Sequence, residues 1–414
     1  AGPLPGSVRA GRALLRGIPT LLLAGYLISR IPPFADPYGM SPFGLYERLA
    51  TQALALLEYL RIAIAPTPSA ITPFYDDYPL LGEHVRGLVG AALLTGWGVL
   101  VALALWNRRR TAALSFAVLW FLAGHSLEST VFPLELFYLH RNYLPSYAIA
   151  FAIVWFFLAR KTPIGSAVRL LLAPYMVLMA LVLFETTTTW GDPDLAGELW
   201  LLDRPASIRA AEFLAARYRD RGDEAVANKI MRESFAKNPS DTGAGLEALR
   251  TYCGETDPHK KEQRLSDIND LLREGAFAKP TTPKLDSLVA AWERGQCPLL
   301  DAAALHAMLD SLFANEGFTR SGRQAHNLHL IRFRLHFASR SFDPAIASLE
   351  AAYARYPNNE TLRLWAEVLA SAGLREEAIE LVDSATPPRT ANLVKAHLWR
   401  EEIDGLRAAL QRPE

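Results

Sequence analysis

The chain has 414 residues, half of them hydrophobic, and its 43 Lys and Arg side chains are balanced by 43 Asp and Glu side chains. This zero formal net charge excludes a generic nucleic-acid binder, which needs a positive excess. The mean hydropathy of +0.09 conceals two populations, because the long apolar runs precede Glu185 and most charged residues follow Asp203. The sequence therefore predicts a membrane half joined to a soluble half.

Five segments of the first half approach the length of a membrane-spanning helix, about 17 to 25 mostly apolar residues. They are Ala13–Ser29, Gly87–Trp106, Thr111–Ala123, Tyr147–Ala159 and Leu170–Phe184. Pro174 is tolerated in the fifth segment because neighbouring helices can cover the carbonyl group that it frees. Since a soluble core absorbs only one or two such runs, we expect an all-α polytopic membrane domain over residues 1–189.

The positions of Lys and Arg predict the orientation of this domain. With a cytoplasmic N-terminus, the inner side collects nine cations and no anion: Arg9, Arg12, Arg16, Arg108, Arg109, Arg110, Arg160, Lys161 and Arg169. The outer side collects the acidic loops 30–86 and 124–146. We therefore expect a multi-pass protein of the bacterial inner membrane, with everything after Glu185 in the periplasm.

The first residues lack an initiator Met, and the apolar run that follows them has no small-residue cleavage site. We expect the chain to begin inside a longer protein.

Helical repeats are predicted over residues 190–414. From Pro205 onward, apolar residues recur at helical spacing, and helix pairs appear at a period near the 34 residues of tetratricopeptide repeats. The predicted helices are Ala206–Tyr218 and Glu224–Lys237 in one unit, and Pro344–Tyr356, Glu360–Ala372 and Arg375–Ser384 in another. The stretch Thr242–Arg340 is expected to hold degenerate repeats, with a long loop near Phe277–Lys284. Such an α-solenoid either only stabilises the protein or docks a protein partner.

The chain has two cysteines, Cys253 and Cys297, and both lie in the predicted periplasmic half. An oxidising compartment favours a disulfide between them. No CxxC pair or Cys/His cluster accompanies them, so we expect neither a metal site nor a cysteine nucleophile.

The outer loop 124–146 is rich in polar side chains for a connection between membrane helices. We expect a site for a lipid phosphate or another substrate there, because ionisable groups at membrane depth often mark a substrate path. The candidate residues are His125, Glu135, His140, Arg141, Asn142 and Tyr143. His140 and Arg141 suit a phosphate, since a guanidinium binds it bidentately and an imidazolium adds a second donor. The alternative is that these groups pair with one another and fix a re-entrant turn.

The preceding outer loop holds an amphipathic stretch from Tyr46 to Ile64, which is too polar to span and suits the membrane interface. Asp76 and Asp77 follow it. Adjacent carboxylates can bind a divalent ion or sugar hydroxyls, although acids in a Tyr/Pro-rich loop are more often simply solvated. No zinc signature, phosphate-binding Gly-rich loop or hydrolase triad is present, so no catalytic residue or cofactor is assigned.

The order of several motifs resembles the membrane domain of the TMTC family, transmembrane proteins with tetratricopeptide repeats that have bacterial relatives. These motifs are Glu47-Arg48-Leu-Ala-Thr51-Gln52, Asp76-Asp77-Tyr78-Pro79 and His140-Arg141-Asn142-Tyr143-Leu144-Pro145. The resemblance covers most of residues 46–240. It implies a glycosyltransferase of the C superfamily that takes a sugar from a polyprenyl-phosphate carrier on the outer membrane face, with the repeats presenting a protein acceptor.

The family's catalytic acidic residues lie in the first outer loop of a longer membrane domain, and no stretch before Ala13 supplies them here. Asp36, Asp76 and Asp77 occupy later loops and do not match them. The expected alternatives are a fragment of a longer enzyme, one partner of a split enzyme, or a descendant without activity. A competing prediction is therefore a non-catalytic membrane scaffold that uses its repeats to recruit proteins.

Overall fold

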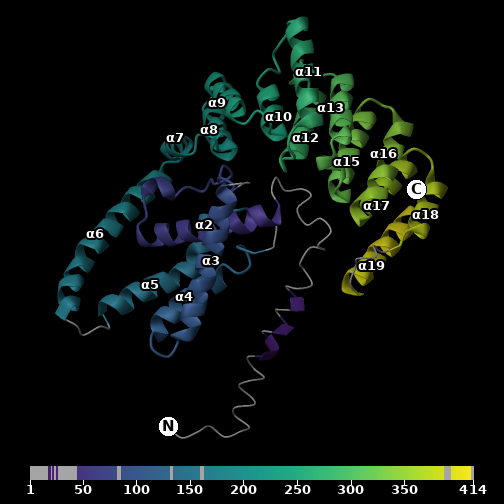
Figure 1. Ribbon diagram of the computed structural model, residues 1–414. Helices are drawn as coiled ribbons and strands as arrows, with labels where there is room; N and C mark the ends of the chain where they lie inside the picture. Colours follow the sequence, from purple (N-terminus) through teal and green to yellow (C-terminus); the bar gives the residue numbers. More distant parts are fainter. Residues whose placement is uncertain are drawn as a thin grey trace. The chain divides into compact units, whose positions relative to one another are not determined.

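The computed structural model describes residues 17–19, 21–22, 25–26, 44–81, 85–130, 134–158, 163–386 and 393–411. Every regular element among these residues is a helix, and one isolated bridge joins Asp241 and Ala276. The prediction of an all-α chain is thus confirmed for the described residues. The chain forms two compact units, Ala1–Arg204 and Pro205–Glu414 (Figure 1).

The first unit is built around helix α2. Its elements are α2 (Leu45–Ile64), η1 (Pro68–Ala70), α3 (Val85–Trp106), α4 (Ala112–Gly124), η2 (Leu139–Asn142), α5 (Tyr143–Leu158), α6 (Pro163–Gly191) and α7 (Pro193–Asp203). Helix α2 packs against α3 and α5, and α4 packs against the same two helices. Gly90 permits the closest approach, because a Cβ atom added there would lie 2.4 Å from the Cβ atom of Ala50. Helix α6 runs along the edge of the unit in Figure 1.

Two described helices are long and apolar enough to cross a membrane, over Gly87–Trp106 in α3 and Leu170–Gly191 in α6. Most of their side chains are exposed, which is unusual for the core helix of a soluble protein. The third and fourth predicted runs form α4 and α5. Their 13 and 16 residues extend about 20 to 24 Å at 1.5 Å per residue, which is shorter than the hydrocarbon core of about 30 Å. The first predicted run, Ala13–Ser29, lies largely outside the described residues.

The boundary between the units falls at Arg204, later than the predicted boundary at residue 190. Asp192 caps α7 by accepting hydrogen bonds from the backbone N–H groups of Asp194 and Leu195, and Pro193 occupies the first helical position. The buried ring of Trp200 then packs edge-on against Trp190 of α6. Helix α7 therefore belongs to the first unit, because its apolar face is covered there.

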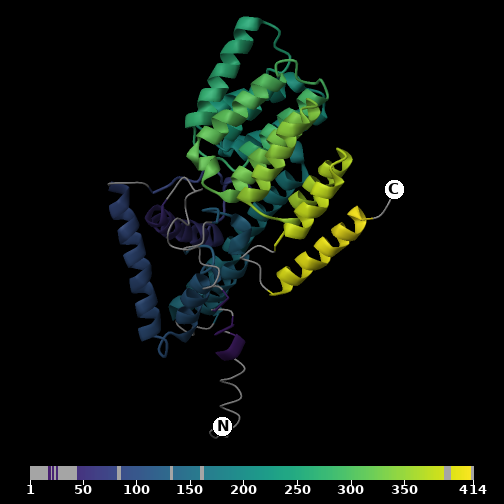
Figure 2. The ribbon, with the colours of Figure 1, turned by 90° about the vertical axis from the view of Figure 1, so that its right-hand side faces the viewer.

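The second unit is a succession of helices packed against their neighbours in the chain (Figures 1 and 2). They are α8 (Ile208–Asp220), α9 (Glu224–Lys237), α10 (Thr242–Arg250), α11 (Pro258–Glu274), α12 (Thr281–Glu293), α13 (Ala302–Ala314), α14 (Glu316–Thr319), α15 (Gly322–Ala338), α16 (Phe342–Arg355), α17 (Asn359–Ser371), α18 (Arg375–Ser384) and α19 (Leu393–Leu410). The predicted helices of both repeat units are present.

Three pairs of helices that are neighbours in the chain are joined by the same turn, which also ends α12 at Gly295. The turns after α8, α15 and α17 place Gly222, Arg340 and Gly373 in the left-handed region, with φ of 85°, 57° and 84°. In each turn the following N–H group bonds to the carbonyl five residues earlier, as in the Schellman motif. The α15–α16 pair has Arg340 at the position where such a turn favours glycine, so its sequence lacks the usual glycine signal.

The predicted long loop near Phe277–Lys284 is wrong in part, because α12 already begins at Thr281. Pro283 lies in its first turn, where no intrahelical N–H donor is lost. Nearby, Cys253 and Cys297 form a disulfide with Cα atoms 4.4 Å apart. Cys297 is buried in the main apolar core of the unit, so the disulfide ties the turn after α10 to that core.

Candidate functional site

The first unit contains a large groove beside the loops that follow α2 and α4, with a volume of about 830 Å³. Its walls come from the C-terminal end of α2, the loop around η1, the η2 turn, α5 and α6, and they are mostly apolar. Two hydrogen bonds hold α6 across the groove. Tyr175 donates to the carbonyl oxygen of Ile64 at 2.8 Å, and the indole N–H of Trp190 donates to that of Ile71 at 3.3 Å.

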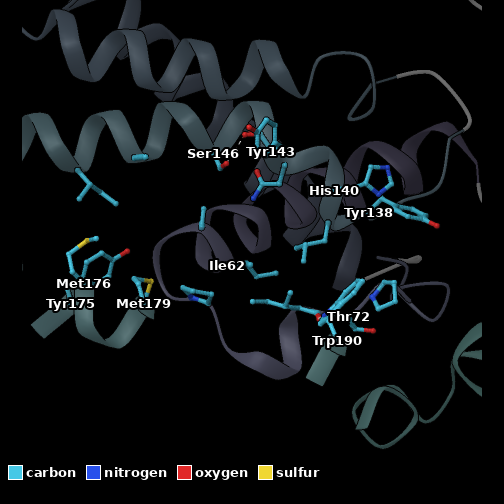
Figure 3. Close-up of a pocket in the computed structure, with 18 of the residues that line it drawn as sticks. Ile62, Thr72, Tyr138, His140, Tyr143, Ser146, Tyr175, Met176, Met179 and Trp190 are labelled. Atoms are coloured by element: carbon cyan, nitrogen blue, oxygen red, sulfur yellow. Dashed lines mark hydrogen bonds between the residues drawn. The ribbon is translucent and has the colours of Figure 1, made fainter. Parts of the chain in front are cut away.

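The lining residues differ between the two sides of the view in Figure 3. One side, which we call the polar end, carries Thr72, Tyr138, His140 and Trp190, whereas the other carries Tyr175, Met176 and Met179. An elongated amphiphile, with an apolar body and a polar head, matches this distribution.

Three of the predicted site residues line this groove: His140, Asn142 and Tyr143. The exposed His140 ring makes no hydrogen bond among the described residues and contacts the edge of Tyr138, with centroids 4.5 Å apart. Asn142 is buried, and its side-chain amide donates to the carbonyl oxygen of Tyr59 at 3.1 Å. The Tyr143 side chain is 86% exposed. The segment His140–Tyr143, which we call the HRNY motif, thus contributes its histidine, asparagine and tyrosine to the groove.

Arg141 does not line the groove, although it follows His140 directly. Its guanidinium lies 3.4 Å from the carboxylate of Glu128, donates to the backbone carbonyl of Glu135 at 3.1 Å and lies over the ring of Tyr138. Burial raises the pKa of Glu128, and the positive charge of Arg141 opposes that shift. Arg141 is therefore engaged within the loop, which is the arrangement that the re-entrant-turn alternative predicted. Glu135 is exposed outside the groove.

His125 also lies away from the groove, at the C-terminal end of α4. It is 1% exposed, and its ring stacks on Tyr59 and meets the edge of Phe121 at centroid distances of 4.6 and 4.8 Å. Burial lowers the pKa of His125 to about 4, and the side chain of Asn142 opposes this shift. The imidazole is neutral at pH 7, so it carries no charge for a phosphate.

The loop that carries the site is held by three residues of α2, Arg48, Gln52 and Tyr59, which were not predicted as site residues. The fully buried guanidinium of Arg48 donates to the backbone carbonyls of Glu128, Thr130 and Leu134. Gln52 donates to the carbonyl of Leu136, and the hydroxyl group of Tyr59 bonds to the N–H and C=O groups of Tyr138. The spacing i, i+4, i+11 places all three on one helix face.

These contacts give α2 a second role beside the predicted interfacial position. Its polar stripe faces the protein and binds loop backbone. The helical spacing of Arg48, Gln52 and Tyr59 was visible in the sequence. It could have been used to predict a polar helix face that is buried against the protein.

The acidic pair Asp76 and Asp77 lies in the loop after η1, and its two carboxylates have different surroundings. Asp77 is paired with Arg204 at 3.7 Å, and the guanidinium of Arg204 also covers the ring of Tyr75. Burial raises the pKa of Asp77, and Arg204 opposes the shift. Asp76 is exposed, and the described part of the chain holds no group of three residues suited to a metal ion.

Comparison with known proteins found no family model that matches the chain and no curated protein that matches it in sequence.

Proposed function

We propose that the first unit is a polytopic membrane domain whose groove binds a polyprenyl-phosphate carrier. The observation that carries this proposal is the groove of about 830 Å³, mostly apolar, whose polar end includes His140. A polyprenyl chain suits the apolar walls, and burying its surface contributes about 25 cal/mol per Å². The phosphate would meet the imidazole of His140, with the guanidinium of Arg141 nearby in sequence but engaged with Glu128.

The membrane orientation is part of the same proposal. The turn between α3 and α4 exposes Arg108, Arg109 and Arg110, which favours the cytoplasmic side. The polar end of the groove is built from the loops at the other ends of these helices, around η1 and η2, and would face the periplasm. The five-span topology includes α4, α5 and the segment Ala13–Ser29 as further spans, with flanking residues extending the two short helices.

With the motif resemblance, these features favour part of a glycosyltransferase that uses a lipid-linked sugar, with the repeats of the second unit presenting a protein acceptor. One observation favours the second candidate, a non-catalytic scaffold. The outer-loop ions Asp77, Glu128 and Arg141 are engaged in ion pairs. Native membranes that contain the protein, incubated with a polyprenyl phosphate carrying a radiolabelled sugar and compared with membranes from a strain that lacks it, separate the two, because only an enzyme or its essential part changes the release or transfer of the label.

Carrier binding is tested with purified protein in nanodiscs and a polyprenyl phosphate as the probe. Ala150 lines the groove, whereas Ala180 on α6 is exposed and does not. Ala150→Phe should weaken binding at least about tenfold by filling the groove, and Ala180→Phe should leave it unchanged. His140→Ala should weaken it by about one to two orders of magnitude, the value of a charge-assisted hydrogen bond. Equal affinities for wild type, Ala150→Phe and His140→Ala would refute the proposal.

A further inference from the structure

A second cavity of about 310 Å³ adjoins the groove in the first unit. Ile71 and Trp190 border both cavities, and the hydrogen bond between them forms part of the shared wall. Its volume is at the lower end of the range for small-molecule sites, about 300 to 1,000 Å³. The groove and the second cavity are therefore neighbours on opposite sides of the Trp190 side chain, which is itself 48% exposed.

Helix α6 places the two cavities in sequence along one face. Leu172, Tyr175, Met176 and Met179 line the groove, whereas Thr186, Thr189 and Trp190 line the second cavity. Thr186 follows Met179 by seven residues, which is two helical turns or about 10 Å. The apolar run predicted from the sequence ends at Phe184, and the candidate span of α6 extends to Gly191. The second cavity thus lies along the last two turns of that span.

The chemistry of the second cavity differs from that of the groove. It is lined by two carboxylates, Glu185 and Asp203, and neither is in an ion pair with any described residue. The Oγ1 atom of Thr186 is buried and has no hydrogen-bond partner in the described part of the chain. No Lys or Arg lines the cavity, so a phosphate would be repelled.

Aromatic surface completes this cavity. Trp190 and Trp200 both line it and meet edge to face, with centroids 5.1 Å apart. A sugar ring offers an apolar C–H face for an indole and hydroxyl donors for carboxylates. An uncharged, hydroxyl-rich head can contact the indole rings and donate hydrogen bonds to the carboxylates. An anionic head can contact only the indole rings, because the carboxylates repel it.

We infer that the cavity formed by Glu185, Thr186, Trp190, Trp200 and Asp203 binds an uncharged sugar head, while the lipid chain of the same molecule lies in the groove. This inference rests on the proposed function and assigns the sugar a site at the junction of α6 and α7. The phosphate stays on the groove side of Trp190, away from the two carboxylates.

The test compares two probes on the full chain in nanodiscs: a bare polyprenyl phosphate and the same lipid carrying a neutral hexose. Wild type should bind the hexose-bearing lipid about tenfold more tightly, since even one hydrogen bond to a charged group has this value. Glu185→Gln, Asp203→Asn and Thr186→Val should each reduce that preference and leave affinity for the bare lipid unchanged. Thr188→Val is the matched control, because Thr188 is exposed on the same helix and does not line the cavity.

The outcomes separate the two proposals. Equal affinity of wild type for both lipids, with Ala150→Phe still weakening each of them, would overturn the sugar cavity and leave carrier binding intact. Absence of binding of either lipid would refute carrier binding, and the sugar cavity with it. An unchanged preference in all three cavity variants would also overturn the inference, provided that their folding matches wild type.

Discussion

Arg48 is predicted to be the residue on which the outer-loop site most depends. Its side chain is fully buried, and its three guanidinium nitrogens each donate to a different loop carbonyl. A buried acceptor that loses its partner costs about 1 to 3 kcal/mol. Arg48→Met leaves three such acceptors, so we expect a loss of about 4 kcal/mol or more in the free energy of unfolding.

Arg48→Lys should recover little of this stability, because one ammonium group cannot reproduce a planar fork directed at three carbonyls. For a unit of this size, 4 kcal/mol corresponds to a fall of about 10 °C in the melting temperature. Thermal unfolding in detergent, followed by fluorescence, measures this change in melting temperature. Arg61 on the same helix is the matched control, since its side chain is 45% exposed and, among the described residues, forms an ion pair only with Glu58. Arg61→Met should cost less than about 1 kcal/mol. An Arg48→Lys protein as stable as wild type would refute the reasoning.

Three further predictions concern stability. Replacing Cys253 and Cys297 by serine should cost about 4 kcal/mol, because the disulfide closes a chain separation of 44 residues; two freely alkylated thiols in unreduced wild type, detected by mass, would contradict the bond. Because the folded-state pKa of His125 is about 4 and its ordinary value is 6.5, the unfolded chain binds a proton that the folded chain does not. The free energy of unfolding should therefore fall by about 3 kcal/mol as the pH drops from about 6.5 to about 4. The same pH titration of His125→Phe should lack this loss of stability. Gly90→Ala should destabilise the protein because its new Cβ atom meets α2 at 2.4 Å, whereas Gly98→Ala has open space and should be neutral or stabilising by up to about 1 kcal/mol in thermal unfolding; equal melting temperatures for the two variants would argue against the close approach.

Local signals were sufficient to predict much of the helical framework. Helices α9 and α18 have the predicted bounds, Glu224–Lys237 and Arg375–Ser384. Each follows a turn that contains a glycine with positive φ, Gly222 or Gly373, and glycine is the residue that such a turn favours. Boundaries set by turn chemistry can be read from a single sequence, because the residues that determine them are adjacent.

The division of roles within the HRNY motif could not be predicted in this way. His140 and Arg141 are neighbours in the 3-10 turn η2, in which successive residues point about 120° apart. One side chain reaches the groove and the other reaches Glu128. The hydrogen-bond acceptors of Arg48 could not be predicted either. They are backbone carbonyls about 80 residues away, and every residue type has such a carbonyl.

These contacts give charged and uncharged residues different roles at the outer loops. Arg48 and Arg141 bind loop backbone or Glu128, and Asp77 binds Arg204, so their removal should alter folding before it alters ligand binding. The groove itself is lined by uncharged residues and by His140. A mutational scan that selects charged residues first would therefore measure mainly the scaffold. Substitutions of groove residues such as Ala150, which change the volume without removing a charge, report on binding more directly.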